Sequence, residues 1–315
     1  MFKSYDITAG RVSECPPEII GKIQVYTTPD EDDKRYLVEE CGIDEHTFYS
    51  ALDDDEISRI EYEEDHVAVI MKQPRNYKGD RSLNFRVASF GMFLFKDRVI
   101  ILQAEPMYIF EHGKMMLRGN SIPGIMLRML YHSTHHFLEH LRIIRSVSDE
   151  IENKIEFSVT NKSLVNMFTL LKSLTYYESA ISANQVLLTR LRSDSRKLGF
   201  SEDEEDFLDD IKVENEQCNN LADIYAGVLT GMSDARVSVV SNNLAIVMKQ
   251  LTIINIVFMP LSVITGLGGM SEFTMMTDHL WWPHAYSGLI LVMAVIGYVT
   301  YVLTKRVGLG ERKKH

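Results

Sequence analysis

The segment 251-LTIINIVFMPLSVITGLGGM-270, with the later run 285-AYSGLILVMAVIGYVTYVLT-304, separates the end of this chain from the rest. Each run has about the 20 apolar residues that a helix needs to cross the hydrocarbon core of a membrane. No Lys or Arg occurs from Leu251 to Thr304. Two buried helices of a large soluble domain are the alternative, but core helices of this length normally carry charge at their solvent edge. The two runs therefore predict a transmembrane hairpin.

Charged residues around the hairpin predict how it lies in the membrane. The connection between the two runs, residues 271–284, carries Glu272 and Asp278 but no Lys or Arg. Basic residues flank the other ends of both runs, at Lys249, Lys305, Arg306, Arg312, Lys313 and Lys314. Because cytoplasmic loops are enriched in Lys and Arg, we expect both termini in the cytoplasm and the connection outside. The residues expected at the membrane interface are aromatic: Trp281, Trp282 and Tyr286.

Composition argues against several classes of protein. The 315 residues include 33 Lys and Arg against 44 Asp and Glu, a formal net charge of −11. Nucleic-acid binding needs a basic surface, so no nucleic-acid partner is expected. Three widely spaced cysteines, Cys15, Cys41 and Cys218, do not form a disulfide framework or a cysteine zinc cluster. The sequence also lacks a P-loop, a nucleophile elbow and a His-Glu-x-x-His motif, so neither enzyme activity nor a bound cofactor is expected.

The residues before the hairpin predict a cytoplasmic α+β domain, an α/β/α layer followed by long helices. Two acidic helices are expected within 29–65. Val, Ile and Phe cluster between Pro, Gly or Asp in three predicted strands, 66–74, 86–95 and 98–103. Gly and Pro become rare after Ser121. From there, helical periodicity predicts helices at 124–157, 160–197 and 202–267.

These elements divide the chain into six predicted parts. They are a cytoplasmic α/β domain (1–120), a cytoplasmic helical hairpin (121–200), a stalk helix continuous with the first membrane helix (201–270), an outer loop (271–284), a second membrane helix (285–304) and a basic cytoplasmic tail (305–315). Within the helical hairpin, the stripe expected to be buried is Leu164, Phe168, Leu171, Leu174 and Ile181. The stalk helix would be roughly 100 Å long. A helix of this length cannot bury its apolar stripe against its own domain alone, so we expect it to pack against copies of itself.

Two clusters in the cytoplasmic part contain residue types that bind metals. In 132-HSTHHFLEH-140, His132, His136 and His140 share one helical face, and the first two are spaced to chelate a metal. No acidic or cysteine ligand completes a tetrahedral set nearby, so a solvated or interfacial helix face is favoured. The run 201-SEDEEDFLDDIKVENE-216 has nine carboxylates and one Lys. It is either a solvated face that opens the stalk helix or a sensor for divalent cations, which prefer clustered oxygen ligands.

One face of the first membrane helix alternates polar and apolar residues. In steps of three or four it presents Ala245, Met248, Leu251, Asn255, Met259, Ser262 and Gly266. A polar Asn255 in a membrane helix is costly unless it meets water or a partner. Two interpretations remain open: the face lines a pore with hydrophobic constrictions and polar stations, or Asn255 joins neighbouring helices by hydrogen bonds.

The stretch 248-MKQLTIINIVFMPLSVITGLGGM-270 resembles the pore helix of CorA-type magnesium channels, the two-TM-GxN superfamily. That family begins this helix with Met-Lys-x-Leu-Thr, carries Met-Pro-Leu in its middle and ends it with Gly-Met-Asn. The resemblance extends to 51-ALDDDEISRIEYEEDHVAVIM-71 and to a helix ending 149-DEIENKI-155. It implies a homopentameric funnel in the inner membrane of a bacterium or archaeon, with the chain's own copies and membrane lipid as partners.

The same resemblance assigns roles to particular residues. Gly269, Met270, Ser271 and Glu272 correspond to the outer mouth, where Ser271 stands in place of the asparagine that the family uses to hold the hydrated cation. Ala245 stands where the family has a pore asparagine near the cytoplasmic end of the helix. Asp210, with its neighbour Asp209, matches the position of an interfacial regulatory carboxylate.

The function that the resemblance implies is transport of a divalent cation, one of Mg²⁺, Co²⁺, Ni²⁺ or Zn²⁺, through a pore made by the first membrane helix and gated by cytoplasmic cation. Serine lacks the amide carbonyl of asparagine, so five copies of Ser271 would form a weaker ring of acceptors. The alternative is a CorA-like protein that conducts weakly or not at all and acts as a membrane-anchored sensor or scaffold.

Overall fold

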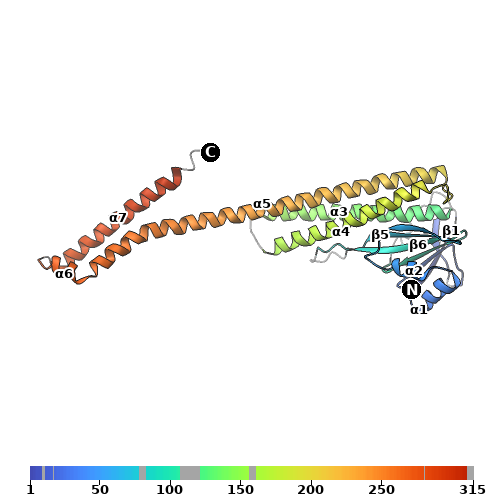
Figure 1. Ribbon diagram of the computed structural model, residues 1–315, viewed down its shortest axis with the longest axis horizontal. Coiled ribbons are helices and arrows are strands. Elements are labelled where there is room, and N and C mark those ends of the chain that lie inside the picture. Colours follow the sequence, from blue (N-terminus) through green and yellow to red (C-terminus); the bar gives the residue numbers. More distant parts are fainter. Residues whose placement is uncertain are drawn as a thin grey trace. The chain divides into compact units, whose positions relative to one another are not determined.

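The structure is a computed structural model that describes residues 1–8, 11–16, 18–77, 83–106, 121–155, 161–279 and 281–310 (Figure 1). The chain forms two compact units, Met1–Ser233 and Asp234–His315. The division between them falls inside one helix, α5 (Glu202–Gly268). Each unit is described separately below.

The first unit is built on a mixed seven-stranded sheet. Its strands are β1 (Phe2–Thr8), β2 (Arg11–Glu14), β3 (Ile23–Thr27), β4 (Arg59–Tyr62), β5 (Val67–Pro74), β6 (Val87–Leu94) and β7 (Val99–Gln103). They are ordered β2-β1-β3-β7-β6-β5-β4. The central pair β3 and β7 is parallel, and the other described pairs are antiparallel. The three predicted strands are confirmed as β5, β6 and β7, whereas β1 to β4 were not predicted individually.

The helices are longer in the second half of the chain. They are α1 (Glu31–Arg35), a π-helical turn (Tyr36–Glu40), α2 (Glu45–Ser50), α3 (Ile122–Ile155), α4 (Asn161–Ser193), α5 (Glu202–Gly268), α6 (Ser271–Met276) and α7 (Trp282–Gly310). The three predicted long helices are confirmed as α3, α4 and α5, with ends within a few residues of those expected. The two short acidic helices expected within 29–65 are also present, separated by the π-helical turn.

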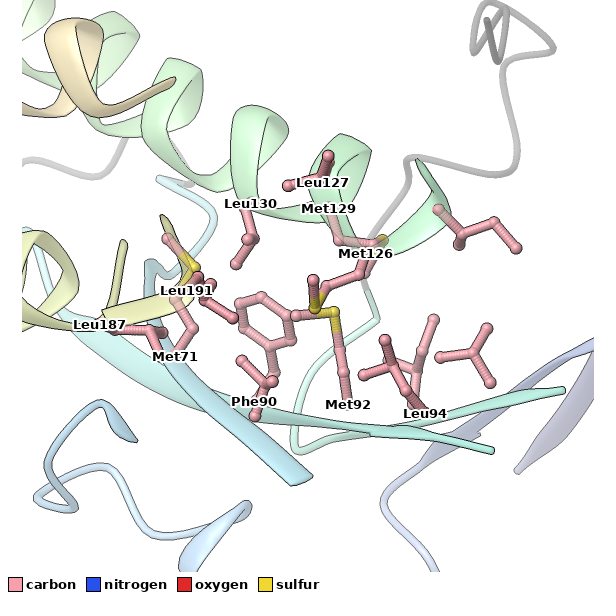
Figure 2. Close-up of a cluster of buried hydrophobic side chains, with 14 of the residues drawn as sticks. Met71, Phe90, Met92, Leu94, Met126, Leu127, Met129, Leu130, Leu187 and Leu191 are labelled. Carbon is pink, nitrogen blue, oxygen red and sulfur yellow. The ribbon is translucent and has the colours of Figure 1, made fainter. Parts of the chain in front are cut away.

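One face of the sheet packs against α3 and α4. Figure 2 shows side chains from the strands meeting side chains from both helices in a single cluster. Phe90 and Met92 of β6 lie among Met126 and Leu130 of α3 and Leu191 of α4. All five side chains are fully buried. Burial of a large apolar side chain of this kind contributes about 1.5–3 kcal/mol. This cluster fixes the two helices on the sheet.

The opposite face of the sheet is covered by the short helices. Ile43 and Phe48 are buried and pack against strand residues that include Phe93. The close approach depends on Gly91 of β6, since a Cβ at this position would lie 2.5 Å from the Cβ of Ala51. Helices on both faces of one sheet confirm the predicted α/β/α layer.

The buried stripe of α4 differs from the prediction by one residue. Phe168, expected in the core, is 60% exposed. Leu174 and Ile181 are buried as expected, and Leu164 and Leu171 are half-buried. The fully buried face is made by Met167, Leu170, Leu174, Tyr177 and Ile181. Aromatic and aliphatic residues on two adjacent faces made the two stripes hard to distinguish from sequence.

The start of α5 is fixed by a capping box. The backbone N–H of Ser201 donates to Glu204 Oε2 at 2.9 Å, and the Glu204 N–H donates to Ser201 Oγ at 3.4 Å. The hydroxyl of Ser121, just before α3, also donates to the Glu204 carboxylate. One carboxylate therefore satisfies donors at the starts of two helices that are far apart in the sequence.

The second unit contains the end of α5, then α6 and α7. Two of the described helices are long and apolar enough to cross a membrane: α5, and α7 over Trp282–Thr304. Almost none of their most apolar stretches is buried against the rest of the chain. Pro260 lies inside α5. The predicted outer loop, 271–284, contains the short helix α6, and the second membrane helix starts at Trp282, three residues before the predicted start.

A buried amide joins α4 to the edge of the sheet. Asn184 is fully buried, and its Oδ1 accepts from the Ser58 hydroxyl at 2.7 Å and from the Lys72 N–H at 3.1 Å. Its Nδ2 donates to the Lys72 carbonyl at 2.9 Å. Asn184 thus satisfies three groups of β5 and of the segment before β4.

We predict that Asn184→Ala destabilises the protein by about 2–4 kcal/mol, because the buried Ser58 hydroxyl and the Lys72 N–H lose their acceptor, although the Lys72 carbonyl keeps the Ser133 hydroxyl. Thermal or denaturant unfolding of the purified protein would measure the loss. Val186→Ala, two residues away on the exposed side of α4, is the matched control and should change stability little. Equal stability of the two variants would contradict the structural role of Asn184.

Candidate functional site

The predicted pore face of α5 is uncovered in the single chain. Each of its members is exposed: Ala245, Met248, Leu251, Asn255, Met259, Ser262 and Gly266. Met259 is 71% exposed, although it lies in one of the most apolar stretches of the sequence. These residues therefore share a face that no part of their own unit covers.

The second apolar helix packs on the opposite side of α5. The half-buried residues of α5 in this region are Ile253, Val257, Pro260, Leu261 and Ile264, and Gly268 is buried. A Cβ added to Gly268 would lie 2.6 Å from Leu289 Cδ2 of α7, and one added to Gly297 of α7 would lie 3.6 Å from Leu261 Cδ1. Because two residues correspond to about 200° of rotation, Val257 and Asn255 point to nearly opposite sides. The hairpin thus leaves the predicted pore face free.

Two polar side chains lie on the predicted pore face, those of Asn255 and Ser262. Elsewhere on α5, the hydroxyls of Thr252 and Thr265 donate to carbonyls one turn earlier in the helix, each at 2.8 Å. In contrast, the Asn255 amide and the Ser262 hydroxyl make no hydrogen bond to any described residue. An unsatisfied amide in hydrocarbon costs several kcal/mol. The face is therefore suited to contact water or another copy of the chain rather than lipid.

The predicted outer mouth lies where α5 ends and α6 begins. The Gly269 N–H still donates to the Thr265 carbonyl at 3.0 Å, and Met270 is extended, with φ −84° and ψ 150°. Ser271 and Glu272 then open α6 with both side chains exposed, and Ser271 Oγ lies 3.3 Å from Glu272 Oε2. The structure thus places a hydroxyl and a carboxylate side by side directly after the membrane helix.

The two predicted regulatory carboxylates have different surroundings. Asp209 accepts from Arg192 Nε at 2.9 Å, and the same guanidinium donates to Glu205 at 2.8 Å. The Ser195 hydroxyl and the Arg192 charge hold the pKa of Glu205 below its usual value. Asp210 is exposed and lines an open groove between the starts of α3 and α5. Sequence reasoning did not pair Arg192 with Asp209, although basic residues end α4 where acidic residues open α5.

The three histidines of α3 do not form a uniform solvated face. His140 is buried, and its Nδ1 lies 2.6 Å from the hydroxyl of Tyr177 on α4. Burial lowers the pKa of His140 to about 3, and the neighbouring His136 adds to the shift. His132 and His136 are half-buried and line a pocket at one edge of the sheet. Of the two possibilities in the expectation, a solvated or an interfacial helix face, His140 has the interfacial one, because α4 covers the end of this stripe.

Comparison with known proteins identifies the family. The family described as CorA-like Mg²⁺ transporter protein matches residues 24–306, which is most of the chain. The chain belongs to this family. The resemblance inferred from 248–270 is thereby confirmed.

Two relatives in the CorA-like family have a similar length. The cobalt/magnesium transport protein CorA of Methanocaldococcus jannaschii is 24% identical over 291 residues, which cover 89% of this chain and 88% of the relative. The protein of the same name from Thermotoga maritima is 24% identical over 258 residues, which cover 79% of this chain and 71% of the relative.

Solved structures share the fold of this CorA-like chain. The complete CorA magnesium transporter of Methanocaldococcus jannaschii has a TM-score of 0.78 at 18% identity, covering 97% of this chain and 96% of that one. The full-length CmaX protein has a TM-score of 0.74 at 14% identity, covering 97% of each chain. The cytoplasmic domain of ZntB from Vibrio parahaemolyticus has a TM-score of 0.60 at 13% identity, covering 76% of this chain and 98% of that one. The α+β domain with long helices and two C-terminal apolar helices is thus a known architecture.

We predict that Gly268→Val destabilises the membrane hairpin of this CorA-like protein by about 1–3 kcal/mol, because the added atoms compete with Leu289 for space. The melting temperature of the full-length protein in detergent would show the loss. The matched control is Gly266→Val, since a Cβ at Gly266 meets nothing within 4 Å. A larger loss in the control than in Gly268→Val would mean that α7 does not pack on this side of α5.

Proposed function

We propose that five copies of the chain surround an axis, with the uncovered face of α5 from each copy lining a pathway for divalent cations. The observation that carries this proposal is the position of Asn255 and Ser262, which lack partners on a face pointing away from α7. Family membership supplies the transporter class, and the number five comes from the resemblance. The relatives named cobalt/magnesium transport proteins support Mg²⁺ and Co²⁺ as candidate cargo.

The pathway would carry a cation that keeps part of its water. Mg²⁺ dehydrates reluctantly, so polar side chains that hydrogen-bond to its hydration shell suit it better than a tight cage of direct ligands. Rings of Asn255 and Ser262 would serve as polar stations inside the membrane. Rings of Met248, Leu251 and Met259 would exclude water when the pore narrows there. A dry hydrophobic constriction stops an ion even where no side chain fills it completely.

The outer mouth would concentrate cations before they enter. Glu272 supplies a negative charge next to the hydroxyl of Ser271, and no Lys or Arg from Leu251 to Thr304 opposes it. Five copies of this pair would raise the local cation concentration. This position requires the 271–284 connection to face outward and both termini to face the cytoplasm, as the distribution of basic residues predicts.

Gating by cytoplasmic cation would act through Asp210 rather than Asp209. Arg192 already neutralises Asp209 within the chain, whereas Asp210 is exposed on an open groove. Hard cations favour carboxylate oxygens, and a cation shared between Asp210 and a neighbouring copy would hold the stalk helices together. Loss of that cation would leave the acidic starts of α5 to repel one another.

We predict that Asn255→Leu lowers divalent-cation flux at least about tenfold, since a loss of only ~1.4 kcal/mol of ion stabilisation gives that factor. Uptake of Mg²⁺, Co²⁺, Ni²⁺ and Zn²⁺ into proteoliposomes would be measured, with the subunit number taken from mass determination in detergent. Asn255→Ser, which keeps a polar group, is the matched control and should retain most of the flux.

Two results would overturn the pore. Normal flux in Asn255→Leu would place Asn255 against a neighbouring helix instead of water. Failure of the unmodified protein to take up any of the four ions above empty vesicles would favour a membrane-anchored sensor or scaffold.

We predict that Ser271→Asn increases Mg²⁺ affinity at the pore mouth by about tenfold, the effect of ~1.4 kcal/mol of added hydrogen bonding to the hydrated ion. Competition of Mg²⁺ uptake by a hexammine cobalt complex, which mimics the hydrated ion, would measure it. Ser271→Ala should shift competition in the opposite direction. Identical competition in all three proteins would exclude Ser271 from the ion pathway.

A further inference from the structure

The first unit contains a polar pocket that the proposed ion pathway does not use. It lies at the edge of the sheet where β5 and β7 end and β6 begins, beside the middle of α3. The pocket has a volume of about 200 Å³, enough for an ion with several waters. Its polar lining is Gln73, Arg75, Asn76, Glu105, His132, His136 and Glu139.

Two histidines on this lining have free ring nitrogens. His135 and His140, on the same helix, have hydrogen-bonding neighbours: His135 Nδ1 lies 3.4 Å from Glu214, and His140 Nδ1 lies 2.6 Å from the Tyr177 hydroxyl. In contrast, His132 and His136 make no hydrogen bond to any described residue and contact only other aromatic rings. Their nitrogens are available to a ligand in the pocket.

The separation of the two rings allows one shared ion. The centroids of the His132 and His136 rings lie 6.1 Å apart. With metal–nitrogen bonds of about 2.0–2.1 Å, two imidazoles on one metal place their centroids about 5 Å apart at a tetrahedral angle and at most about 6.4 Å apart. Spacing of one helical turn keeps both rings on the same side of α3. A rotation of the side chains that brings the rings about 1 Å closer would therefore let them share one ion.

Further groups in the pocket favour a cation. Gln73 is only 7% exposed, and its side chain has no hydrogen-bond partner among the described residues. Glu139 follows His136 by three residues and lines the same pocket. The charge of Arg75, which would repel a cation, is matched by ion pairs with Asp54 and with Glu105, the latter at 3.2 Å.

We propose that His132 and His136 chelate one transition-metal dication, of the Co²⁺, Ni²⁺ or Zn²⁺ class, with the Gln73 amide oxygen and water completing its coordination. Imidazole nitrogen suits these metals and not Mg²⁺, which prefers oxygen. In the described part of the chain, no group of three or more His, Cys, Asp or Glu side chains is arranged to hold a metal. The site therefore has two histidine ligands and binds reversibly, so it can report the cytoplasmic concentration of such a metal independently of the pore.

The experiment measures Ni²⁺ binding to the full-length protein in detergent, with excess Mg²⁺ present to occupy oxygen-ligand sites. We expect one Ni²⁺ per chain that is lost in His132→Ala and His136→Ala, each weakening affinity at least about tenfold, the cost usual even for partners outside the first shell of a metal. His135→Ala is the matched control on a neighbouring face of α3, where its Nδ1 lies 3.4 Å from Glu214 of α5 and outside the pocket, and it should bind Ni²⁺ normally. Binding that survives both pocket substitutions, or that His135→Ala weakens equally, would overturn the proposal.

A second measurement needs no substitution. Diethyl pyrocarbonate modifies accessible neutral imidazoles, and mass spectrometry locates the modified residues. We expect Ni²⁺, but not Mg²⁺, to protect His132 and His136, whereas protection of neither would overturn the proposal. Repeating both measurements on Asn255→Leu separates this site from the ion pathway, because the pocket should bind Ni²⁺ whether or not the variant conducts.

Discussion

An amide cannot remain in hydrocarbon without a hydrogen-bonding partner, and this constraint governs the second unit of the protein. Asn255 lies in the apolar stretch of α5, a helix long and apolar enough to cross a membrane, yet no described group satisfies its amide. The chain's own second apolar helix, α7, packs on the far side of α5, through the contacts of Gly268 and Gly297. In the pore proposed above, water or another copy of the chain would supply the partner of Asn255. The same arrangement would satisfy Ser262, about one turn beyond Met259.

Much of the fold was predictable because its signals are local. The helices α3, α4 and α5 have strong periodicity and few Gly or Pro residues, and β5 to β7 are rich in β-branched and aromatic residues between clear breaks. β1 to β4 were not predicted individually: charged and polar residues interrupt the apolar ones in β1 and β4, and β4 has only four residues. Phe168 was misplaced because a helix with apolar residues on two faces does not reveal which one the neighbouring helices α3 and α5 will cover.

The candidate sites were predictable to different degrees for the same reason: some depend on local spacing and others on long-range contacts. The face of α5 that carries Asn255 follows from helical spacing alone, so its members could be named from sequence. The surroundings of the α3 histidines could not, because they depend on Tyr177 of α4 and on Gln73 of β5, which only the fold brings near. The same holds for Asp209, whose charge is matched by Arg192 across the turn between α4 and α5. Long-range contacts thus decide which of several similar side chains is available to a ligand.

Pro260 gives α5 a mechanical property that its length alone would not. Proline has no N–H, so the carbonyl of Ile256 loses its usual partner within the helix. A helix bends most readily where one rung of its hydrogen-bond ladder is missing. This hydrogen bond is missing at Pro260, between Met259 and Ser262. The last turns of α5 can therefore tilt at this position while the rest of the helix stays straight. Any movement of the outer end of α5 relative to the rest of the helix would therefore have its hinge at Pro260.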